Sequence, residues 1–222
     1  MSWFRELNSL GPTLGANTAP ADVNEAAGRL LSHDDKLGCF GCHATSATQG
    51  TRLTLDKMIP GVQCGHCHQG TEAHLAAMLH PSSSEATVPP SLSALSAEQT
   101  SNFCGQCHRT WAEIAMQGNP GIANIRFQPY RLTGSKCYDP DDARISCVAC
   151  HNPHKEVSSR PMDYDQKCLA CHQHGKPGAK ACSVSKSKCV TCHMPKIELP
   201  GGHYKFSDHR IRIVKSNEPY PG

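Results

Sequence analysis

CVACHNPH, residues 147–154, is the stretch of sequence that decides the fold. Its two cysteines are three positions apart, and a histidine directly follows the second. From the frequencies of Cys and His in the chain, chance predicts about 0.06 copies of this C-x-x-C-H pattern. The pattern occurs at Cys39–Cys42–His43, Cys64–Cys67–His68, Cys104–Cys107–His108, Cys147–Cys150–His151, Cys168–Cys171–His172 and Cys189–Cys192–His193.

The spacing within each motif has a chemical reason. Two sulfurs on one helical turn can form thioethers with the two vinyl groups of one porphyrin, and the next residue then places its imidazole on the iron. Zinc sites also use C-x-x-C pairs, but zinc gives no reason for a histidine after every pair. A disulfide scaffold is typical of shorter secreted chains. We therefore expect six covalently attached haem c groups, each with the histidine of its motif as proximal ligand.

The composition agrees with an interior filled by cofactors. Only 38% of the 222 residues are hydrophobic and 5% are aromatic. Six haems leave about 37 residues for each, too few to wrap every haem separately, so neighbouring porphyrins must share walls. We expect a fold of mostly α-helix and coil with little β-structure. Residues 1–222 would form one haem-packed domain, with a sub-division into a two-haem part (1–80) and a four-haem part (97–222) as an alternative.

Local patterns add a few expected elements. Helical periodicity is short and covers Ala73–Leu79 and Ser96–Met116, and Ile211–Val214 resembles a small strand. The stretch Pro81–Ser96 has the composition of a linker or of a surface loop, and the loop is favoured. Successive motifs start 25, 40, 43, 21 and 21 residues apart. The last three haems should therefore lie close together.

Eight histidines lie outside the motifs, which is enough to give six irons a second axial ligand. We expect distal ligands at His33, His74, His80, His154, His203 and His209. The other two, His66 and His174, are too near a proximal histidine to cap its own iron. Rival ligands are Met78, Met116 and Met194, but the supply of histidine favours bis-His irons, which have lower reduction potentials than His/Met irons.

Two cysteines are left over once the motifs are assigned. These are Cys137 and Cys182, each shortly upstream of a motif. In an oxidising compartment we expect a disulfide between them, with two unpaired thiols as the alternative.

The charge of the chain changes when the expected haems are counted. The polypeptide carries +3 at pH 7, but twelve propionates would bring the holoprotein to roughly −9, which disfavours nucleic-acid binding. Several basic residues are expected to pair with propionates, and anchoring a substrate is their alternative role. They are Arg52, Arg109, Arg126, Arg131, Lys196, Arg210 and Arg212.

No apolar run has the length of a transmembrane helix. The segment Met1–Asn17 also lacks the basic and apolar regions of a signal peptide. Haem attachment of this kind takes place outside the cytoplasm, so we expect a periplasmic, cell-surface or extracellular protein with a leader or a further domain upstream.

Four stretches resemble motifs of bacterial multihaem cytochromes: CGHCHQGTEAH (64–74), CVACHNPH (147–154), CVTCHMPK (189–196) and HYKFSDHRI (203–211). The nearest group is the family of the tetrahaem cytochrome that accepts electrons from hydroxylamine oxidoreductase. The resemblance runs from about Cys39 to Ile211. It implies extracytoplasmic electron transfer through closely stacked haem pairs, with His74, His154, His203 and His209 as distal ligands. The chain departs from the family in having six motifs and Gln69–Gly70–Thr71 where Gly-Pro-Gly is usual.

The expected function is electron transfer to and from redox partner proteins, without substrate chemistry. One alternative is a redox enzyme for a small nitrogen or sulfur oxyanion, which needs a five-coordinate haem with acid–base groups beside it. The C-x-x-C-K motif of pentahaem nitrite reductases does not occur. Another alternative is a homo-oligomer or filament subunit, which needs haems exposed at both ends and histidines donated between chains.

Overall fold

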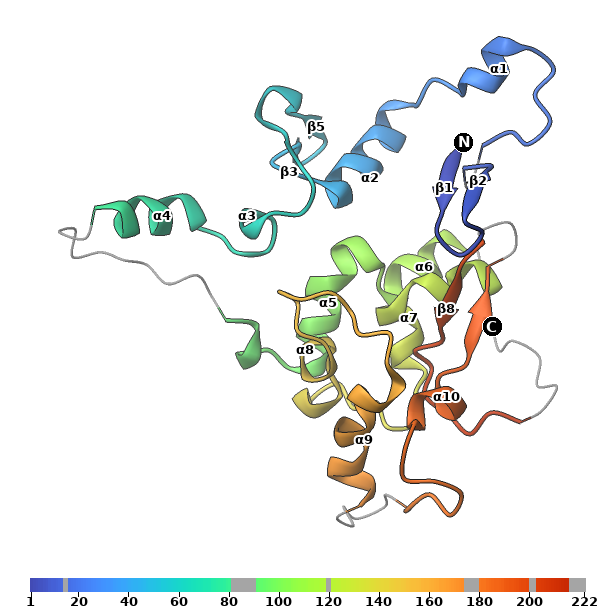
Figure 1. Cartoon of the computed structure of the whole chain (residues 1–222). Coiled ribbons are helices and arrows are strands. Elements are labelled where there is room, and N and C mark those ends of the chain that lie inside the picture. The colour runs from blue at the N-terminus through green and yellow to red at the C-terminus, as the bar shows by residue number, and fades with distance from the viewer. Residues whose placement is uncertain (14–15, 81–90, 119–120, 174–179, 200–202, 216–222) are drawn as a thin grey trace. The chain divides into compact units, whose positions relative to one another are not determined.

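The computed structural model describes residues 1–13, 16–80, 91–118, 121–173, 180–199 and 203–215. The chain divides into two compact units (Figure 1). The smaller unit is residues 16–92 and contains the first two C-x-x-C-H motifs. The larger unit combines residues 1–15 with residues 93–222 and contains the other four motifs. Residues 81–90 of the expected loop lie outside the described residues.

The smaller unit consists of short helices and two-residue strands. Its elements are α1 (Val23–Ala27), α2 (His33–His43), β3 (Ala44–Thr45), β4 (Thr48–Gln49), β5 (Arg52–Leu53), η1 (Leu55–Lys57), β6 (Ile59–Pro60), α3 (Cys64–Cys67) and α4 (Thr71–Leu79). A capping box starts α2: the Ser32 side chain accepts the Asp35 backbone N–H, and the Asp35 carboxylate accepts that of Ser32. The helix expected over Ala73–Leu79 is confirmed as α4.

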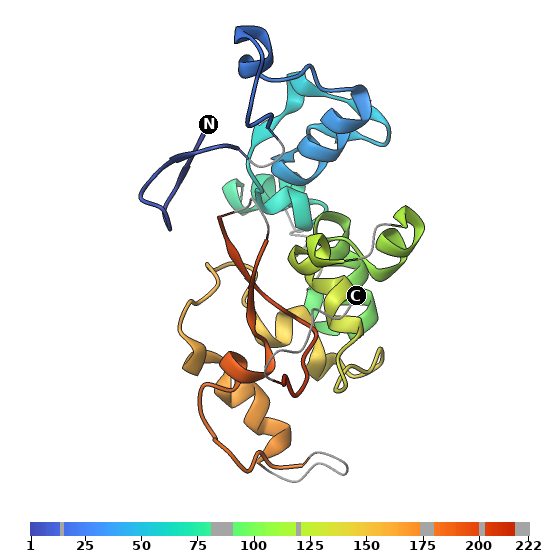
Figure 2. The ribbon, with the colours of Figure 1, turned by 90° about the vertical axis from the view of Figure 1, so that its right-hand side faces the viewer.

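The larger unit begins with the β1 (Ser2–Phe4) and β2 (Ser9–Gly11) hairpin and is otherwise mainly helical. Its remaining elements are α5 (Ala97–His108), α6 (Trp111–Gln117), η3 (Ile122–Arg126), α7 (Gln128–Thr133), η4 (Ala143–Ile145), α8 (Cys147–Cys150), η5 (Pro161–Tyr164), α9 (Asp165–His172), α10 (Cys189–His193), β7 (Lys196–Glu198) and β8 (Lys205–Ser207). The short helix η2 (Leu92–Ala94) lies at the boundary between the units. In this unit α5 packs against both α7 and α8 (Figures 1 and 2).

The helical pattern expected over Ser96–Met116 is confirmed as α5 and α6. They are separate helices, because Arg109 has φ 54° and Thr110 starts α6 with its own capping box. The strand expected over Ile211–Val214 was wrong, since residues 211–214 form no strand. The β-structure of the tail is instead the antiparallel β7–β8 ladder, in which Ile197 pairs with Phe206.

The fold class expected from the sequence, mostly helix and coil with little strand, is confirmed. Within the described residues, the sheets are four separate two-stranded antiparallel ladders. Each ladder joins segments of one unit, and none forms a layer under the helices. The described residues therefore contain no sheet on which a protein core could be built.

The polypeptide supplies little core of its own. Among the described residues only eight hydrophobic side chains are buried, and three of them are alanines (Ala44, Ala47 and Ala97). Many large hydrophobic side chains of the described residues are exposed instead, among them Trp3, Leu75, Leu79 and Trp111. Apolar surface that an ordinary fold would bury is therefore open along the described residues.

Candidate haem-binding sites

Each motif lies on one turn of helix at a helix end or as a short helix of its own. Motifs one, three and five fall at the C-terminal ends of α2, α5 and α9, and motif six forms α10. The cysteine pairs of motifs two and four span α3 and α8, and their histidines are the C-cap residues. In α8 the His151 N–H donates to the Cys147 carbonyl at 2.8 Å, and the Ser146 hydroxyl caps the helix by accepting the Ala149 N–H at 3.3 Å. The two sulfur-bearing residues and the histidine of a motif thus share one turn, as thioether attachment requires.

In the smaller unit, hydrogen bonds join the end of motif one to the start of motif two. The Gly61 N–H donates to the His43 carbonyl at 3.2 Å. The Thr45 hydroxyl donates to the Gly61 carbonyl at 2.9 Å and accepts the Gln63 N–H at 2.9 Å. Residues that follow His43 are therefore fixed against those that precede Cys64.

In the larger unit, the first thiols of neighbouring motifs meet in two pairs. A hydrogen bond between the Cys104 and Cys147 thiols lowers the pKa of Cys104 and raises that of Cys147, and it joins α5 to α8. Burial together with the nearby Cys189 and Cys150 raises the pKa of Cys168 to about 12, and Cys168 also shares a hydrogen bond with Cys189. Motifs three to six are thereby linked in chain order.

The sixth motif depends on a carboxylate from another helix. Asp165, the first residue of α9, accepts the backbone N–H groups of Lys188 at 2.7 Å and Cys189 at 2.9 Å. These hydrogen bonds, from Cys189 first and then Lys188, lower the pKa of Asp165. Lys188 has a left-handed backbone, with φ 55°. Asp165 therefore caps α10 in place of a local N-cap side chain.

A buried ion-pair cluster organises the tail of the chain. The Asp208 carboxylate accepts hydrogen bonds from Arg131 Nε at 2.9 Å and Arg131 Nη2 at 3.0 Å, and from Arg212 Nη1 at 2.6 Å. Asp208 is 0% exposed. Burial acts to raise the pKa of Asp208, but the bonds from Arg131, the Arg210 backbone and Arg212 hold it below its ordinary value. The cluster fixes the tail to α7.

Backbone carbonyls orient two of the proximal imidazoles. Nδ1 of His172 lies 2.9 Å from the Lys180 carbonyl, and Nδ1 of His193 lies 2.8 Å from the Arg212 carbonyl. A carbonyl accepts from Nδ1–H, which leaves Nε2 with a free lone pair. Both rings are thus in the tautomer that binds a metal through Nε2.

The tail also brings His209 against the proximal His151. Their ring centroids are 6.2 Å apart with an interplanar angle of 42°. Nδ1 of His209 lies 2.9 Å from the Ser207 carbonyl. Burial lowers the pKa of His209 to about 4 and also lowers that of His151. Both imidazoles are therefore neutral near pH 7, the form that coordinates iron.

The other predicted distal ligands occupy different parts of the two units. His33 is the first residue of α2. Its Nε2 lies 2.8 Å from the Thr51 carbonyl, which leaves Nδ1 as the nitrogen that can bind a metal. His74 lies within α4, and His80 caps its C-terminal end. His154 follows α8, and the ring of His203 packs edge-on against Phe4 at 5.0 Å. The iron that each of these five would cap stays a prediction, and His174 lies outside the described residues.

The expected disulfide is absent from the structure, in which neither Cys137 nor Cys182 is disulfide-bonded. Burial raises the pKa of Cys137, with smaller contributions from the neighbouring Cys150 and Cys171. Cys182 is exposed, and the backbone N–H groups of Ser185 and Val184 lower its pKa. Cys137 thus lies among the attachment cysteines of motifs four and five.

Two of the arginines expected to pair with propionates have a partner within the protein. The guanidinium groups of Arg131 and Arg212 are bound to Asp208, and Arg131 is only 2% exposed. They stabilise the tail, and their pairing with propionates stays a prediction. Sequence reasoning missed Asp208 and Asp165 altogether. The position of Asp208 directly before a predicted ligand was a signal, whereas nothing in the sequence links Asp165 to α10.

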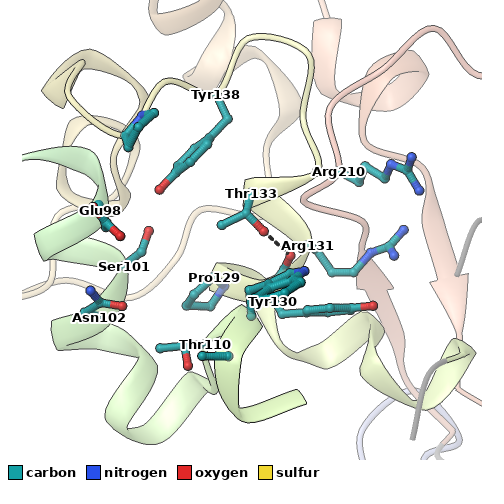
Figure 3. A pocket seen from close by; sticks show the side chains of 14 residues that line it. Glu98, Ser101, Asn102, Thr110, Pro129, Tyr130, Arg131, Thr133, Tyr138 and Arg210 are labelled. Atoms are coloured by element: carbon teal, nitrogen blue, oxygen red, sulfur yellow. Dashed lines mark hydrogen bonds between the residues drawn. The ribbon is translucent and has the colours of Figure 1, made fainter. Parts of the chain in front are cut away.

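A cavity of about 490 Å³ lies between α5, α6 and α7 (Figure 3). Trp111, Tyr130 and Tyr138 contribute rings to its wall, and Glu98 and Arg210 contribute charges. Neither a cysteine nor a histidine lines it. Of the residues assigned to haem, the cavity is lined only by Arg131 and Arg210, which were expected to pair with propionates.

The residues present fit haem on three observations. The two cysteines of each motif lie on one helical turn, two of the histidines that follow them bond a carbonyl through Nδ1 so that Nε2 can bind iron, and large hydrophobic side chains of the described residues are exposed. Within the described residues, no three His, Cys, Asp or Glu side chains converge on a point that could hold a single metal ion. When bound, haem would supply one-electron redox chemistry at its iron.

The fold and these sites fit covalent haem at C-x-x-C-H motifs. The family described as cytochrome c554 and c-prime has a sequence model that matches residues 14–69, a stretch that includes the first two motifs. At this coarse level the match supports covalently bound haem c and a haem-based role in electron transfer. Comparison with curated proteins and with solved structures finds no match.

In the part of the chain that the structure describes, no helix is both long enough and apolar enough to cross a membrane.

Proposed function

We propose that this chain is a hexahaem c-type cytochrome that relays electrons along closely spaced, mainly bis-His haems. The observation that carries the proposal is the contact between neighbouring attachment sites: Cys104 with Cys147 and Cys168 with Cys189. Sulfurs that touch become thioethers of adjacent porphyrins, so the edges of those porphyrins lie next to each other. Electrons then pass between haems without leaving the protein.

The links between motifs give the relay an order. In the larger unit Cys104 meets Cys147, Cys150 acts on the pKa of Cys168, and Cys168 meets Cys189. The third, fourth, fifth and sixth haems would therefore follow each other in space as they do in the sequence. In the smaller unit the bonds between residues 43–45 and 61–63 bring the first two haems together.

The proposal places the protein outside the cytoplasm, where haem of this type is attached, with soluble or membrane-bound redox proteins as its donor and acceptor. The protein would set the haem potentials through axial ligands, burial and charge. It would contain no catalytic residue, because every iron would have two side-chain ligands.

The test begins with the haem content. The chain is produced in a host that matures c-type cytochromes, and a pyridine haemochrome assay with intact mass should give six haems per polypeptide. The ferric protein should be entirely low-spin, and the reduced protein should bind no carbon monoxide. Fewer than six haems contradicts the hexahaem assignment, and carbon monoxide binding by one haem supports the enzyme alternative instead.

A further inference from the structure

We infer that His151 and His209 are the two axial ligands of one iron, that of the haem attached at Cys147 and Cys150. This inference rests on the proposed function, since it requires haem at the fourth motif. It identifies the iron that one of the tail histidines caps.

The separation of the two rings is the first argument. An imidazole nitrogen binds a metal at about 2 Å, so two imidazoles on opposite sides of one iron have centroids about 6 Å apart. The centroids of His151 and His209 are 6.2 Å apart. The separation of His151 and His209 thus equals the separation that two imidazoles bound to one iron require.

The second argument is the way His209 is held. The Ser207 carbonyl, 2.9 Å from Nδ1, accepts the proton on that nitrogen and leaves Nε2 as the available donor. The Ser135 hydroxyl donates to the His209 carbonyl at 2.9 Å and accepts the Ile211 N–H at 2.8 Å. The preceding residue, Asp208, is locked to Arg131. The His209 backbone is thus fixed on both sides, as a preorganised ligand requires.

The third argument concerns His151. Its ring packs edge-on against Tyr164, with centroids 5.5 Å apart, while His209 lies 6.2 Å away. The motif turn fixes its backbone through the bond to Cys147. One competitor exists, because His108 of the third motif also acts electrostatically on His209, though less than His151 does. The experiment must separate these two irons.

The first measurement uses the complete six-haem protein. The His209→Ala variant should retain six haems, show one high-spin ferric haem and bind one equivalent of carbon monoxide on reduction. Added imidazole should restore the low-spin spectrum. A matched control is Ser207→Ala, which keeps the backbone carbonyl and should bind no carbon monoxide. If His209→Ala stays fully low-spin while the wild type has six haems, the inference is overturned and the proposed function survives.

The second measurement identifies the iron. His209→Ala is combined with Cys147→Ala/Cys150→Ala, which removes the fourth haem, or with Cys104→Ala/Cys107→Ala, which removes the third. The inference expects no added carbon monoxide binding in the first background and one added equivalent in the second. The reverse result assigns His209 to the iron of His108 and overturns the inference.

If a five-haem protein does not accumulate, single-cysteine variants that keep the haem attached can be used instead. Cys147→Ala or Cys104→Ala alone keeps the haem on one thioether and leaves one vinyl group intact, which shifts the α-band of that haem. Each cysteine change is then combined with His209→Ala. Carbon monoxide should bleach the shifted band when the cysteine change is Cys147→Ala and leave it unchanged when the cysteine change is Cys104→Ala. Bleaching of the second band and not the first overturns the inference.

Discussion

The carboxylate of Asp208 and the guanidinium of Arg131 form a buried, two-bonded ion pair, with N–O distances of 2.9 and 3.0 Å, across 77 residues of sequence. The pair connects α7 to the segment that contains His209 and Arg212. Through that segment it supports the imidazole facing His151 and the carbonyl that orients His193. One ion pair thus helps to position residues at two of the proposed haem sites.

Loss of this ion pair should therefore be costly. Asp208→Asn leaves Arg131 buried without a counter-charge, and removal of one partner from a buried pair costs about 3–5 kcal/mol. Chemical denaturation followed by the Soret band should show this loss in the free energy of unfolding. The matched control is Asp163→Asn, which breaks an exposed pair with Arg160 and should cost less than about 1 kcal/mol. Equal effects of the two variants would contradict a structural role for Asp208.

Gly105 of the third motif should not tolerate a methyl group. A Cβ at this position would overlap Cγ2 of Thr110. That side chain cannot rotate freely, because its hydroxyl bonds to Glu113 in the capping box of α6. Gly105→Ala should cost about 1–3 kcal/mol from overpacking.

The control for Gly105 is Gly41→Ala in the first motif, where the nearest neighbour of a new Cβ is Thr48 Oγ1 at an ordinary 3.9 Å. Because alanine favours helix more than glycine does, this variant should be neutral or more stable by up to about 1 kcal/mol. Thermal unfolding monitored at 222 nm measures both variants. A stable Gly105→Ala protein would show that Thr110 can move aside.

Asp165→Ala should weaken the sixth haem site selectively. The change leaves the N–H groups of Lys188 and Cys189 without their shared acceptor, at a cost of about 1–3 kcal/mol. Because α10 has no local side-chain cap, its first turn should fray, and the haemochrome assay should find some protein with five haems. The exposed Asp141 offers a control, and Asp141→Ala should keep all six. Full haem content and unchanged stability in Asp165→Ala would argue against the cap.

Without haem the chain should be largely unfolded. Eight buried hydrophobic side chains among the described residues are too few to offset the conformational entropy of ordering the backbone. Protein produced without the maturation apparatus should show weak helical signal in far-UV circular dichroism and no cooperative melting. A sharp thermal transition in this apoprotein would disprove the prediction.

The sequence predicted the fold class well, because the motifs require helical turns and the composition leaves no apolar stripe for a sheet. It predicted α4 but not the break at Arg109, since that break depends on the Thr110–Glu113 capping box interrupting an otherwise continuous pattern. The sequence did not predict which residues far apart in the chain are in contact. Arg131 looked like other exposed basic residues, and only the folded chain places it against Asp208. The free Cys137 was misjudged for the same reason, because its neighbours are Cys150 and Cys171.

The contact between Phe4 and His203 has a consequence for biogenesis. Phe4, in the first strand, is 3% exposed and packs against the rings of His203 and Tyr204, with centroids 5.0 and 5.4 Å apart. Phe4 can therefore be buried only after residues 203 and 204 have been synthesised, by which time residues 16–92 have already left the ribosome. Trimming the amino-terminal hairpin should accordingly loosen the carboxy-terminal tail, although nearly two hundred positions separate them in the chain.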